Sequence, residues 1–255
     1  MYNKDEILSR AYRLLGDDAM KRLADTRVII FGVGGVGSWC AESLVRTGVG
    51  HLTIVDCDRV SVSNINRQLM ATVETVGQIK VDALKSHLLT INPEADIVTR
   101  CEVFTAETAE NFDLDAYDYV IDAIDSLKDK VLLIEKATRS KAKFYSSMGA
   151  ALKLDPTRIA VAEFSKVKGC PLARALRQRF KKQQTWPRRK FLCVYSDELL
   201  RNLGATDEDG SANSADPDGL APSRKAQVNG SLMHITAIFG LTLAGLVIGD
   251  VCDRH

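Results

Sequence analysis

The sequence lacks the paired cysteines that usually hold a zinc ion. Its six cysteines are Cys40, Cys57, Cys101, Cys170, Cys193 and Cys252, and no two of them form a Cys-x-x-Cys motif. This spacing argues against a zinc ribbon and against a thioredoxin-like redox couple. We expect the six side chains to be free thiols in the reducing environment of the cytoplasm.

The sequence also lacks an excess of charge of either sign. Its 255 residues include 34 basic and 33 acidic ones. The charge of the whole chain therefore does not indicate a nucleic-acid-binding or membrane-surface protein, and any basic surface must be local. We expect no DNA partner.

Only one stretch is apolar in the way of a membrane helix. Residues 1–5 are polar and charged, unlike a secretory signal. Residues 235–249 are fifteen uncharged residues, which is short of the roughly 20 that a membrane-spanning helix needs. We interpret them as a buried core helix in which Gly240, Gly245 and Gly249 let a neighbouring element approach. The protein is therefore expected in the cytoplasm, without membrane contact.

Residues 1–150 alternate helical periodicity with short apolar runs. Residues 4–24 carry an apolar face broken near Gly16, which predicts an N-terminal helical arm. We expect strands at 27–33, 51–56, 97–103, 117–124 and 144–148, and helices at 38–47, 80–91 and 128–140. This order predicts an α/β fold with a Rossmann-like, doubly wound, mostly parallel sheet. Ligands should bind at the carboxyl ends of its strands.

The composition changes twice after residue 150. Residues 166–190 contain ten basic residues and no acidic one, and residues 204–223 contain five acidic residues among Gly, Ser, Asn and Pro. We interpret these stretches as a basic segment and a mobile loop. The chain is thus divided into an arm, a core and a C-terminal extension that form one continuous domain, with boundaries at 1–24, 25–150 and 151–255.

The strongest motif is Gly32-Val33-Gly34-Gly35-Val36-Gly37, directly after a predicted strand and directly before a predicted helix. Glycine allows a tight turn here and brings the amides at the helix N-terminus close to a phosphate. Asp56 lies 19 residues beyond Gly37, at the end of the next strand, where a carboxylate can hold ribose hydroxyls. This fingerprint alone fits NAD, FAD, S-adenosylmethionine or ATP.

The side chains after the second predicted strand favour ATP among these ligands. Asp56 and Asp58 are followed by Asn64, Arg67 and Lys80. Negative charge accumulates on the phosphates as pyrophosphate leaves, and two cations would stabilise it. A dinucleotide such as NAD requires no such pair.

Two carboxylates end a later predicted strand at the same edge of the sheet. They are Asp122 and Asp125, and one of them could hold Mg²⁺, which prefers a carboxylate together with phosphate oxygens. Each also has a structural alternative as a helix cap or a solvated side chain. Capping is a serious alternative for Asp125, because Ser126 and a predicted helix follow it.

As a set, these motifs resemble the adenylating domain of the ubiquitin-activating-enzyme superfamily. The runs 34–39, 46–48, 120–126, 155–157 and 193–196 are similar to a family of tRNA-modifying dehydratases within it. The resemblance implies that the threonyl carboxylate of threonylcarbamoyladenosine in tRNA attacks ATP, giving an acyl adenylate and pyrophosphate. The modification then cyclises and expels AMP, so that the net change is loss of water.

The resemblance also implies roles for individual residues. Gly32, Gly34 and Gly35 would line the phosphates, and Asp56 would bind the ribose. Asn64, Arg67 and Lys80 would hold the phosphates, and Asp125 would bind Mg²⁺. Gly37, Asp58 and Asp122 would complete the nucleotide site, and the catalytic residues would be Arg67, Lys80, Asp125 and Arg13. Arg13 matches an arginine that the superfamily lends across a dimer interface, which implies a homodimer. Arg13 could equally be an ordinary surface arginine.

The basic segment offers candidate contacts for tRNA. Arg188, Arg189 and Lys190 could bind phosphates, and Trp186 could stack on an anticodon-loop base. The alternative is a solvated basic helix facing the acidic loop 207–218, with Trp186 packed in the core.

Three other functions are left open. Adenylation of the C-terminal glycine of a ubiquitin-like sulfur carrier is disfavoured because many such enzymes carry Cys-x-x-Cys zinc ligands. An NAD-dependent oxidoreductase would leave Arg67 and Lys80 unexplained and has no evident His or Tyr for proton transfer. A non-catalytic nucleotide-binding scaffold is the third. A thioester or persulfide role for Cys193 is disfavoured because an acyl adenylate with an internal nucleophile needs no thiol, and a sulfur-transfer or reactivation protein is left open as a partner.

Overall fold

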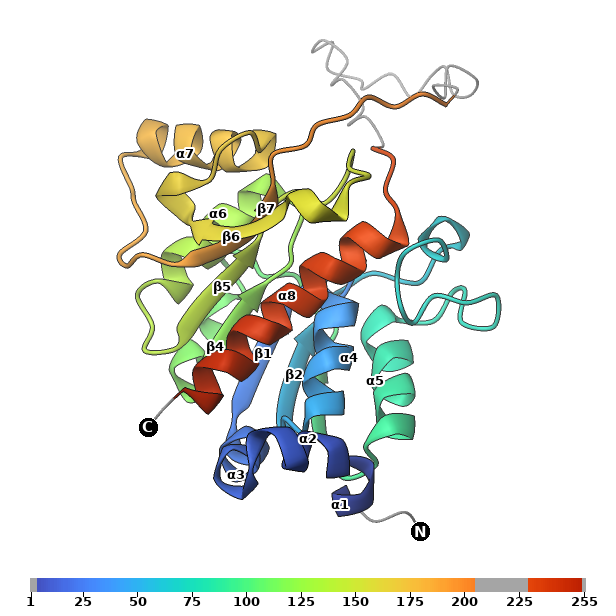
Figure 1. Cartoon of the computed structure of the whole chain (residues 1–255). Coiled ribbons are helices and arrows are strands. Elements are labelled where there is room, and N and C mark those ends of the chain that lie inside the picture. Colours follow the sequence, from blue (N-terminus) through green and yellow to red (C-terminus); the bar gives the residue numbers. More distant parts are fainter. Residues whose placement is uncertain (1–3, 205–228, 254–255) are drawn as a thin grey trace.

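The structure is a computed structural model that describes residues 4–204 and 229–253 (Figure 1). The acidic loop expected at 204–223 lies, apart from Gly204, outside the described residues. The rest of the chain folds around one seven-stranded sheet.

The N-terminal arm is helical and broken at Gly16, as predicted, and a further break divides it into three short helices. They are α1 (Lys4–Ile7), α2 (Ser9–Leu15) and α3 (Asp17–Asp25). The break between α2 and α3 is at Gly16, whose φ of 77° lies in the left-handed region. The amide of Gly50 donates to the carbonyl oxygen of Leu23 at 3.2 Å, so the arm is tied to the amino end of the second strand.

The sheet has the order β3-β2-β1-β4-β5-β7-β6. Its strands are β1 (Arg27–Phe31), β2 (His51–Val55), β3 (Asp96–Arg100), β4 (Tyr119–Asp122), β5 (Lys143–Ser147), β6 (Ile159–Glu163) and β7 (Leu192–Ser196). All neighbours are parallel except β6, which is antiparallel to β7. From β1 the chain adds β2 and β3 on one side, and then crosses to add β4 and β5 on the other side of β1. The predicted Rossmann-like, mostly parallel sheet is therefore confirmed.

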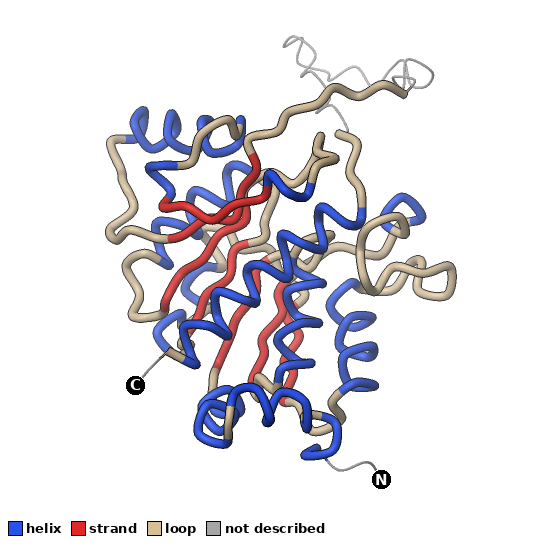
Figure 2. The backbone as a smooth tube through the Cα atoms, viewed as in Figure 1, coloured by secondary structure: helices blue, strands red, loops and turns tan. Residues whose placement is uncertain are grey.

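Helices cover both faces of this sheet (Figure 2). One face carries α4 (Gly37–Thr47), α5 (Lys80–Ile91) and α8 (Met233–Cys252), and the other carries α6 (Leu127–Ala137) and α7 (Pro171–Gln183). Single-turn 3₁₀ helices are η1 (Val62–Asn64), η2 (Ala109–Asn111), η3 (Leu114–Ala116), η4 (Pro156–Arg158) and η5 (Phe164–Lys166). Successive side chains of β1 point to opposite faces of the sheet. Ile30 packs with α4 and α8, whereas Ile29 packs with α6.

The apolar C-terminal helix is a core helix, as predicted. The expectation that this stretch is too short to span a membrane is wrong, because α8 has 20 residues and could cross one by length and hydropathy. However, α8 lies across the sheet (Figure 1), and half of its most apolar part is buried there. Phe239 and Leu243 are fully buried. A Cβ atom on Gly240 would collide with the carbonyl oxygen of Val36, so the expected close approach of a neighbouring element is confirmed at this glycine, and that element is α4. The same expectation is wrong for the glycines at 245 and 249, where a Cβ atom would meet no atom within 4 Å.

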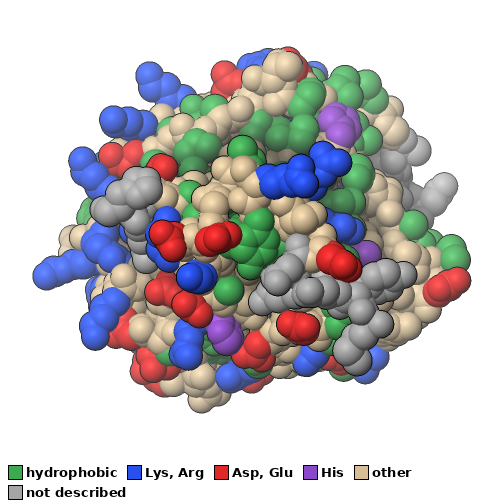
Figure 3. Space-filling model, turned by 60° about the horizontal axis from the view of Figure 1, so that its bottom comes forward, with side chains coloured by type: hydrophobic (Ala, Val, Ile, Leu, Met, Phe, Trp, Pro, Cys, Tyr) green, Lys and Arg blue, Asp and Glu red, His purple; other side chains and the backbone are tan. Residues whose placement is uncertain are grey.

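The C-terminal extension adds two strands that the sequence did not predict. β7 pairs with β5, and β6 covers the edge of β7. Cys193 and Val194 of β7 are fully buried, so this strand extends the core of the sheet. The face of the molecule in Figure 3 shows acidic and basic side chains mixed in its left and lower parts, and apolar side chains gathered in its upper part.

Candidate nucleotide-binding site

A cavity of about 760 Å³ lies at the carboxyl edge of the sheet, where β1 and β4 separate. This is the position at which doubly wound sheets bind ligands. Of the residues predicted from sequence, the lining includes Gly32, Gly34, Gly35, Asp56, Asp58, Arg67, Lys80 and Asp125. The structure therefore brings together eight residues spread over more than 90 positions of the chain.

Glycine is required at both ends of the loop after β1. Gly32 has a φ of 84°, and a Cβ atom there would lie 2.7 Å from the carbonyl oxygen of Ala123. A Cβ atom on Gly37 would collide with the carbonyl oxygen of Gly32. Gly37 thus shapes the turn without lining the cavity, whereas Gly34 and Gly35 present their backbone to it.

Asp56 connects the glycine loop to the loop after β2. Its Oδ2 accepts a hydrogen bond from the amide of Val33 at 2.9 Å, and its Oδ1 accepts one from the amide of Asp58 at 2.9 Å. Each carboxylate oxygen keeps a further lone pair for a ligand. Asp56 therefore fixes the shape of the cavity wall and can still accept a hydroxyl.

Two cations reach the cavity from the segment after β2. Lys80, the first residue of α5, is 6% exposed, and its Nζ lies 2.7 Å from Oδ2 of Asp58. The guanidinium of Arg67 donates to the carbonyl oxygen of Ser63 and to Oδ1 of Asn66, both at 2.9 Å. Both positive charges are held in place by the protein before any anion is bound.

Asn64 does not line the cavity. Its Oδ1 accepts a hydrogen bond from the amide of Ser61 at 3.1 Å and closes the capping box of η1. The expectation that Asn64 holds phosphate rests on the resemblance, and the structure gives this side chain a capping role in the segment that leads to Arg67.

Asp122 and Asp125 have different surroundings. Asp122 is fully buried, does not line the cavity, and is paired with the ammonium of Lys130 at 2.8 Å. Asp125 is exposed on the cavity wall. The N-cap of α6 is Ser126, and no side chain makes a capping hydrogen bond there. Asp125 is therefore available to a ligand rather than used as a cap.

Several lining residues were missed as site residues. Gln68 is 6% exposed, and its Oε1 is buried without a hydrogen-bond partner. Asp129 lies four positions after Asp125, in the first turn of α6. The signal in the sequence was an acidic side chain in the first turn of the helix predicted at 128–140. Gln68 adjoins Arg67 in the motif, but only the fold shows that its carboxamide is buried beside the glycine loop.

The cavity has a charged half and an uncharged half. All its charged side chains come from the loops after β2, β3 and β4 and from α5 and α6. The wall formed by β5, α7 and the start of α8 contributes only uncharged residues, namely Ser147, Met148, Gly149, Ala150, Ala151, Leu172, Asn229, Ser231 and Thr236. A phosphate chain and its cation fit the first half, and a neutral group fits the second.

A preformed metal cage is absent from the part of the chain that the structure describes. No group of three or more His, Cys, Asp or Glu side chains converges there. Mg²⁺ does not require such a cage, because it commonly uses one or two carboxylates together with phosphate oxygens and water. Asp125 and Asp129 are carboxylates of the kind it would need.

Arg13 lies far from the cavity of its own subunit. It is an exposed residue of α2, and the arm packs at the amino ends of the strands (Figure 1). The cavity lies at the carboxyl ends. Arg13 could therefore reach a nucleotide only in a second copy of the chain.

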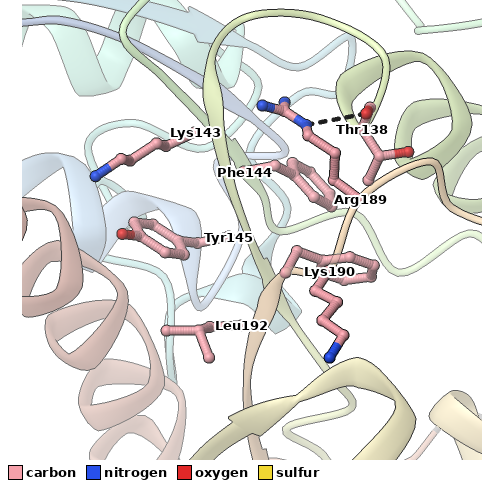
Figure 4. Close-up of a pocket in the computed structure, with 8 residues that line it drawn as sticks. Thr138, Lys143, Phe144, Tyr145, Arg189, Lys190 and Leu192 are labelled. Atoms are coloured by element: carbon pink, nitrogen blue, oxygen red, sulfur yellow. Dashed lines mark hydrogen bonds between the residues drawn. The ribbon is translucent and has the colours of Figure 1, made fainter.

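The basic residues before β7 are also separate from the cavity. The guanidinium of Arg189 donates to the backbone carbonyl oxygens of Thr138, Ala137 and Ala142 at 3.0, 3.2 and 2.8 Å, and so holds the end of α6 (Figure 4). Arg189 therefore has a structural role. Lys190 is largely exposed, with its Nζ 3.6 Å from Glu163.

Trp186 is 55% exposed and contacts Phe180, so the alternative in which it packs in the core is wrong. Arg188 is also exposed. Both residues remain accessible to a partner, although they precede β7 and lie about one strand length, ~17 Å, from the carboxyl edge.

The Cys193 thiol is fully buried, and burial raises its pKa far above the usual range. A reactive cysteine needs the thiolate form and an accessible sulfur. Cys193 has neither, in agreement with the expected absence of a thiol relay.

Comparison with known proteins places this site in a family. The family model described as the ThiF family matches residues 8–249. The chain belongs to the ThiF family. It is 36% identical over 246 residues to the tRNA threonylcarbamoyladenosine dehydratase of Bacillus subtilis, an alignment that covers 95% of this chain and 93% of that protein.

The same likeness extends to solved structures. The crystal structure of Escherichia coli tRNA N6-threonylcarbamoyladenosine dehydratase, TcdA, in complex with ATP has a TM-score of 0.82 and 31% identity to this ThiF-family chain, covering 97% of this chain and 94% of that one. By contrast, the adenylyltransferase and sulfurtransferase MOCS3 of Culex quinquefasciatus is 33% identical over 154 residues, which cover 60% of this chain and 34% of that protein.

Proposed function

We propose that this protein is an ATP-dependent tRNA threonylcarbamoyladenosine dehydratase of the cytoplasm. The observation that carries the proposal is the cavity at the carboxyl edge of the sheet, between β1 and β4. It is lined by the glycine loop, by the cations Arg67 and Lys80, and by the unpaired carboxylate of Asp125. The similarity to dehydratases over nearly the whole chain supports the same function. The protein acts on a carboxylate that belongs to its substrate.

The reaction proceeds in two steps. An oxygen of the threonyl carboxylate forms a bond to the α-phosphorus of ATP, the bond to the bridging oxygen breaks, and pyrophosphate leaves with the electron pair. An atom within the modification then attacks the acyl carbon, the bond to the AMP oxygen breaks, and AMP leaves while a proton is released. One water is lost overall from the modified nucleoside.

The protein's own residues align the reactants and neutralise charge. The amides of Gly34 and Gly35 face the phosphates, Asp56 accepts ribose hydroxyls, and Arg67 and Lys80 stabilise the charge that builds on the leaving pyrophosphate. The uncharged wall near Thr236 receives the threonylcarbamoyl group, so that its carboxylate meets the α-phosphate at the junction of the two halves.

Asp125, together with Asp129 in the first turn of α6, would hold Mg²⁺ against the phosphates. The ion would supply further charge neutralisation for pyrophosphate as it leaves. The absence of an Asp125 capping bond at the start of α6 supports this role.

The active form is a homodimer in which Arg13 of one subunit reaches the nucleotide of the other. The distance of Arg13 from its own cavity makes a partner subunit necessary for any such role. A two-fold arrangement would supply the arginine to both sites.

The surface of α7 provides a path for tRNA toward the cavity. Leu172, in its first turn, lines the cavity, and Arg174, Arg179, Lys181 and Lys182 are exposed along the helix. The loop that carries Arg188 and Lys190 continues this surface. Phosphates of an anticodon stem-loop bound along it would bring the modified base to the uncharged wall.

The alternative, adenylation of the C-terminal glycine of a sulfur carrier, has weaker support. The sulfurtransferase relative matches only three fifths of this chain, and no paired cysteine motif is available for a zinc ion.

The decisive experiment is mass analysis of nucleosides from tRNA that carries threonylcarbamoyladenosine, after incubation with the protein, ATP and Mg²⁺. The proposal requires the modified nucleoside to lose the mass of one water, with pyrophosphate and AMP formed in equal amounts. Reactions with NAD in place of ATP serve as controls. Unchanged nucleoside together with adenylation of a carrier protein would support the alternative.

A further inference from the structure

Four polar contacts converge beneath the loop that joins β4 to α6. Asp122, the last residue of β4, and Lys130, in α6, are both fully buried, with Nζ 2.8 Å from Oδ2. The same ammonium donates to the carbonyl oxygen of Ile124 at 2.8 Å. The amide of Ile124 donates to Oδ1 of Asp122 at 3.1 Å, and the hydroxyl of Ser146 in β5 donates to Oδ2 at 2.7 Å.

Stability alone is a poor reason for such a pair. Removing two charges from water is costly, and a buried ion pair often contributes no more to stability than apolar residues of similar volume. The pair instead fixes the orientation of the backbone at Ile124. Both polar groups of Ile124, its amide and its carbonyl, are bound to the two partners, so the orientation of this residue is fixed on both sides.

Asp125 follows Ile124 directly and depends on that orientation. Its carboxylate lies on the cavity wall, and among the described residues it has no hydrogen-bond partner of its own. The direction of the Asp125 side chain is therefore set by the backbone of the loop, which the Asp122–Lys130 pair holds from below.

We infer that Lys130 and Asp122 are positioning residues that act through the Ile124 backbone to hold the Asp125 carboxylate toward the nucleotide and its cation. The inference rests on the proposed role of Asp125. Neither Lys130 nor Asp122 lines the cavity, so neither contacts a reactant. Ser146 joins the group as a further support from the neighbouring strand.

The test uses the full-length double variant Asp122→Asn with Lys130→Met, which removes both charges together and leaves no unpaired ion in the core. We expect a melting temperature near that of the wild type, about tenfold slower pyrophosphate release at saturating ATP and tRNA, and a several-fold higher Mg²⁺ requirement. The matched control is Lys153→Met. Lys153 is also buried, but its ammonium binds the carbonyl oxygens of Ser196 and Glu198, away from this loop.

A comparison in the Asp125→Asn background separates positioning from a general structural effect. If the pair acts through Asp125, the double substitution should cause little further loss of activity once Asp125 is already Asn. If the fold-loss in activity of the combined variant equals the product of the two separate fold-losses, as for independent sites, the inference is overturned. A folded double variant with wild-type activity and Mg²⁺ requirement would overturn it as well.

Amide hydrogen exchange of the peptide that contains residues 123–126 provides a readout without ATP or tRNA. Exchange there should be faster in the double variant than in the Lys153→Met control, and equal rates would contradict the inference. This measurement tests the pair even if the wild-type protein proves inactive on tRNA. If the double variant does not fold, Ser146→Ala, which removes one neutral hydrogen bond to Asp122, should show the same change on a smaller scale.

Discussion

The ammonium of Lys80 lies 2.7 Å from the carboxylate of Asp58, although Lys80 is almost completely buried and Asp58 is exposed. The amide of Lys80 also donates to the carbonyl oxygen of Asp58 at 2.9 Å. These two contacts join the start of α5 to the loop after β2. The lysine charge is thus balanced and fixed at the cavity wall, where a phosphate chain can share the ammonium.

Lys80→Ala should slow pyrophosphate release by about two orders of magnitude. This corresponds to a loss of about 3 kcal/mol of charge stabilisation in the transition state. The rate should be measured with saturating ATP and modified tRNA. Lys85→Ala is the matched control, because Lys85 is on the same helix but does not line the cavity. Equal rates for both variants would remove Lys80 from the proposed mechanism.

Asp125→Asn should reduce activity, whereas Asp122→Asn should reduce stability. Asp125→Asn should lose most pyrophosphate formation and keep the wild-type melting temperature, because its carboxylate is exposed in the cavity. Asp122→Asn should lower the free energy of unfolding by about 3 kcal/mol, because Lys130 would remain buried without its charged partner.

Thermal denaturation and a pyrophosphate assay on the same samples distinguish the two effects. Small and equal effects of both substitutions would contradict the proposed metal-binding role of Asp125.

Much of the core fold could be predicted from sequence because local signals and tertiary structure agree there. The predicted helix at 80–91 has the same bounds as α5, whose C-cap is Asn92, directly before Pro93, a residue that cannot continue a helix. The glycine loop and Asp56 are set by short-range spacing, which the parallel β-α-β unit converts into proximity. Arg67 and Lys80 could be predicted for the same reason, because they lie in the segment that follows β2.

The remaining features depend on contacts between distant residues. β6 has the exposed pattern of an edge strand, which carries little hydrophobic periodicity, and only its pairing with β7 defines it. Arg189 was predicted to bind tRNA, yet its guanidinium binds carbonyl oxygens about 50 positions earlier in the chain. Composition cannot distinguish an arginine that caps a helix from one that meets a partner.

Cys193→Ala should retain cyclisation. Burial raises the pKa of the Cys193 thiol far above its usual range, which favours the uncharged thiol over the nucleophilic thiolate. The substitution should cost some stability through lost packing, which a melting curve would show, while kcat stays within a few-fold of the wild type. A folded but inactive variant would indicate a covalent role for the cysteine after all.

Arg13→Ala and Lys80→Ala subunits should complement each other if Arg13 acts across a dimer. Each variant alone should be nearly inactive, because each lacks one cation at every site. A mixed dimer has one site with both cations, so mixing should restore part of the activity. Subunit exchange must be shown independently by mass spectrometry. If the subunits exchange and no activity is recovered, Arg13 does not act on the nucleotide of a partner subunit.

Charge reversal on the proposed tRNA surface should weaken tRNA binding without affecting ATP. The suitable variant combines Arg188→Glu, Lys190→Glu, Lys181→Glu and Lys182→Glu, all at exposed side chains. It leaves Arg189 in place, because reversing that residue would free the end of α6 and confuse misfolding with lost binding.

Fewer phosphate contacts release fewer counterions, so the slope of log affinity against log salt concentration should become shallower by roughly one to three units. Calorimetric ATP binding should be unchanged, because none of the four residues lines the cavity. The control for position compares the pair Lys181→Glu and Lys182→Glu with reversal of Lys21 and Lys85, two cations of the arm and α5 that lie outside this surface. If the control weakens tRNA binding as strongly as the α7 variant, or if neither changes the salt slope, tRNA must approach the cavity over a different surface.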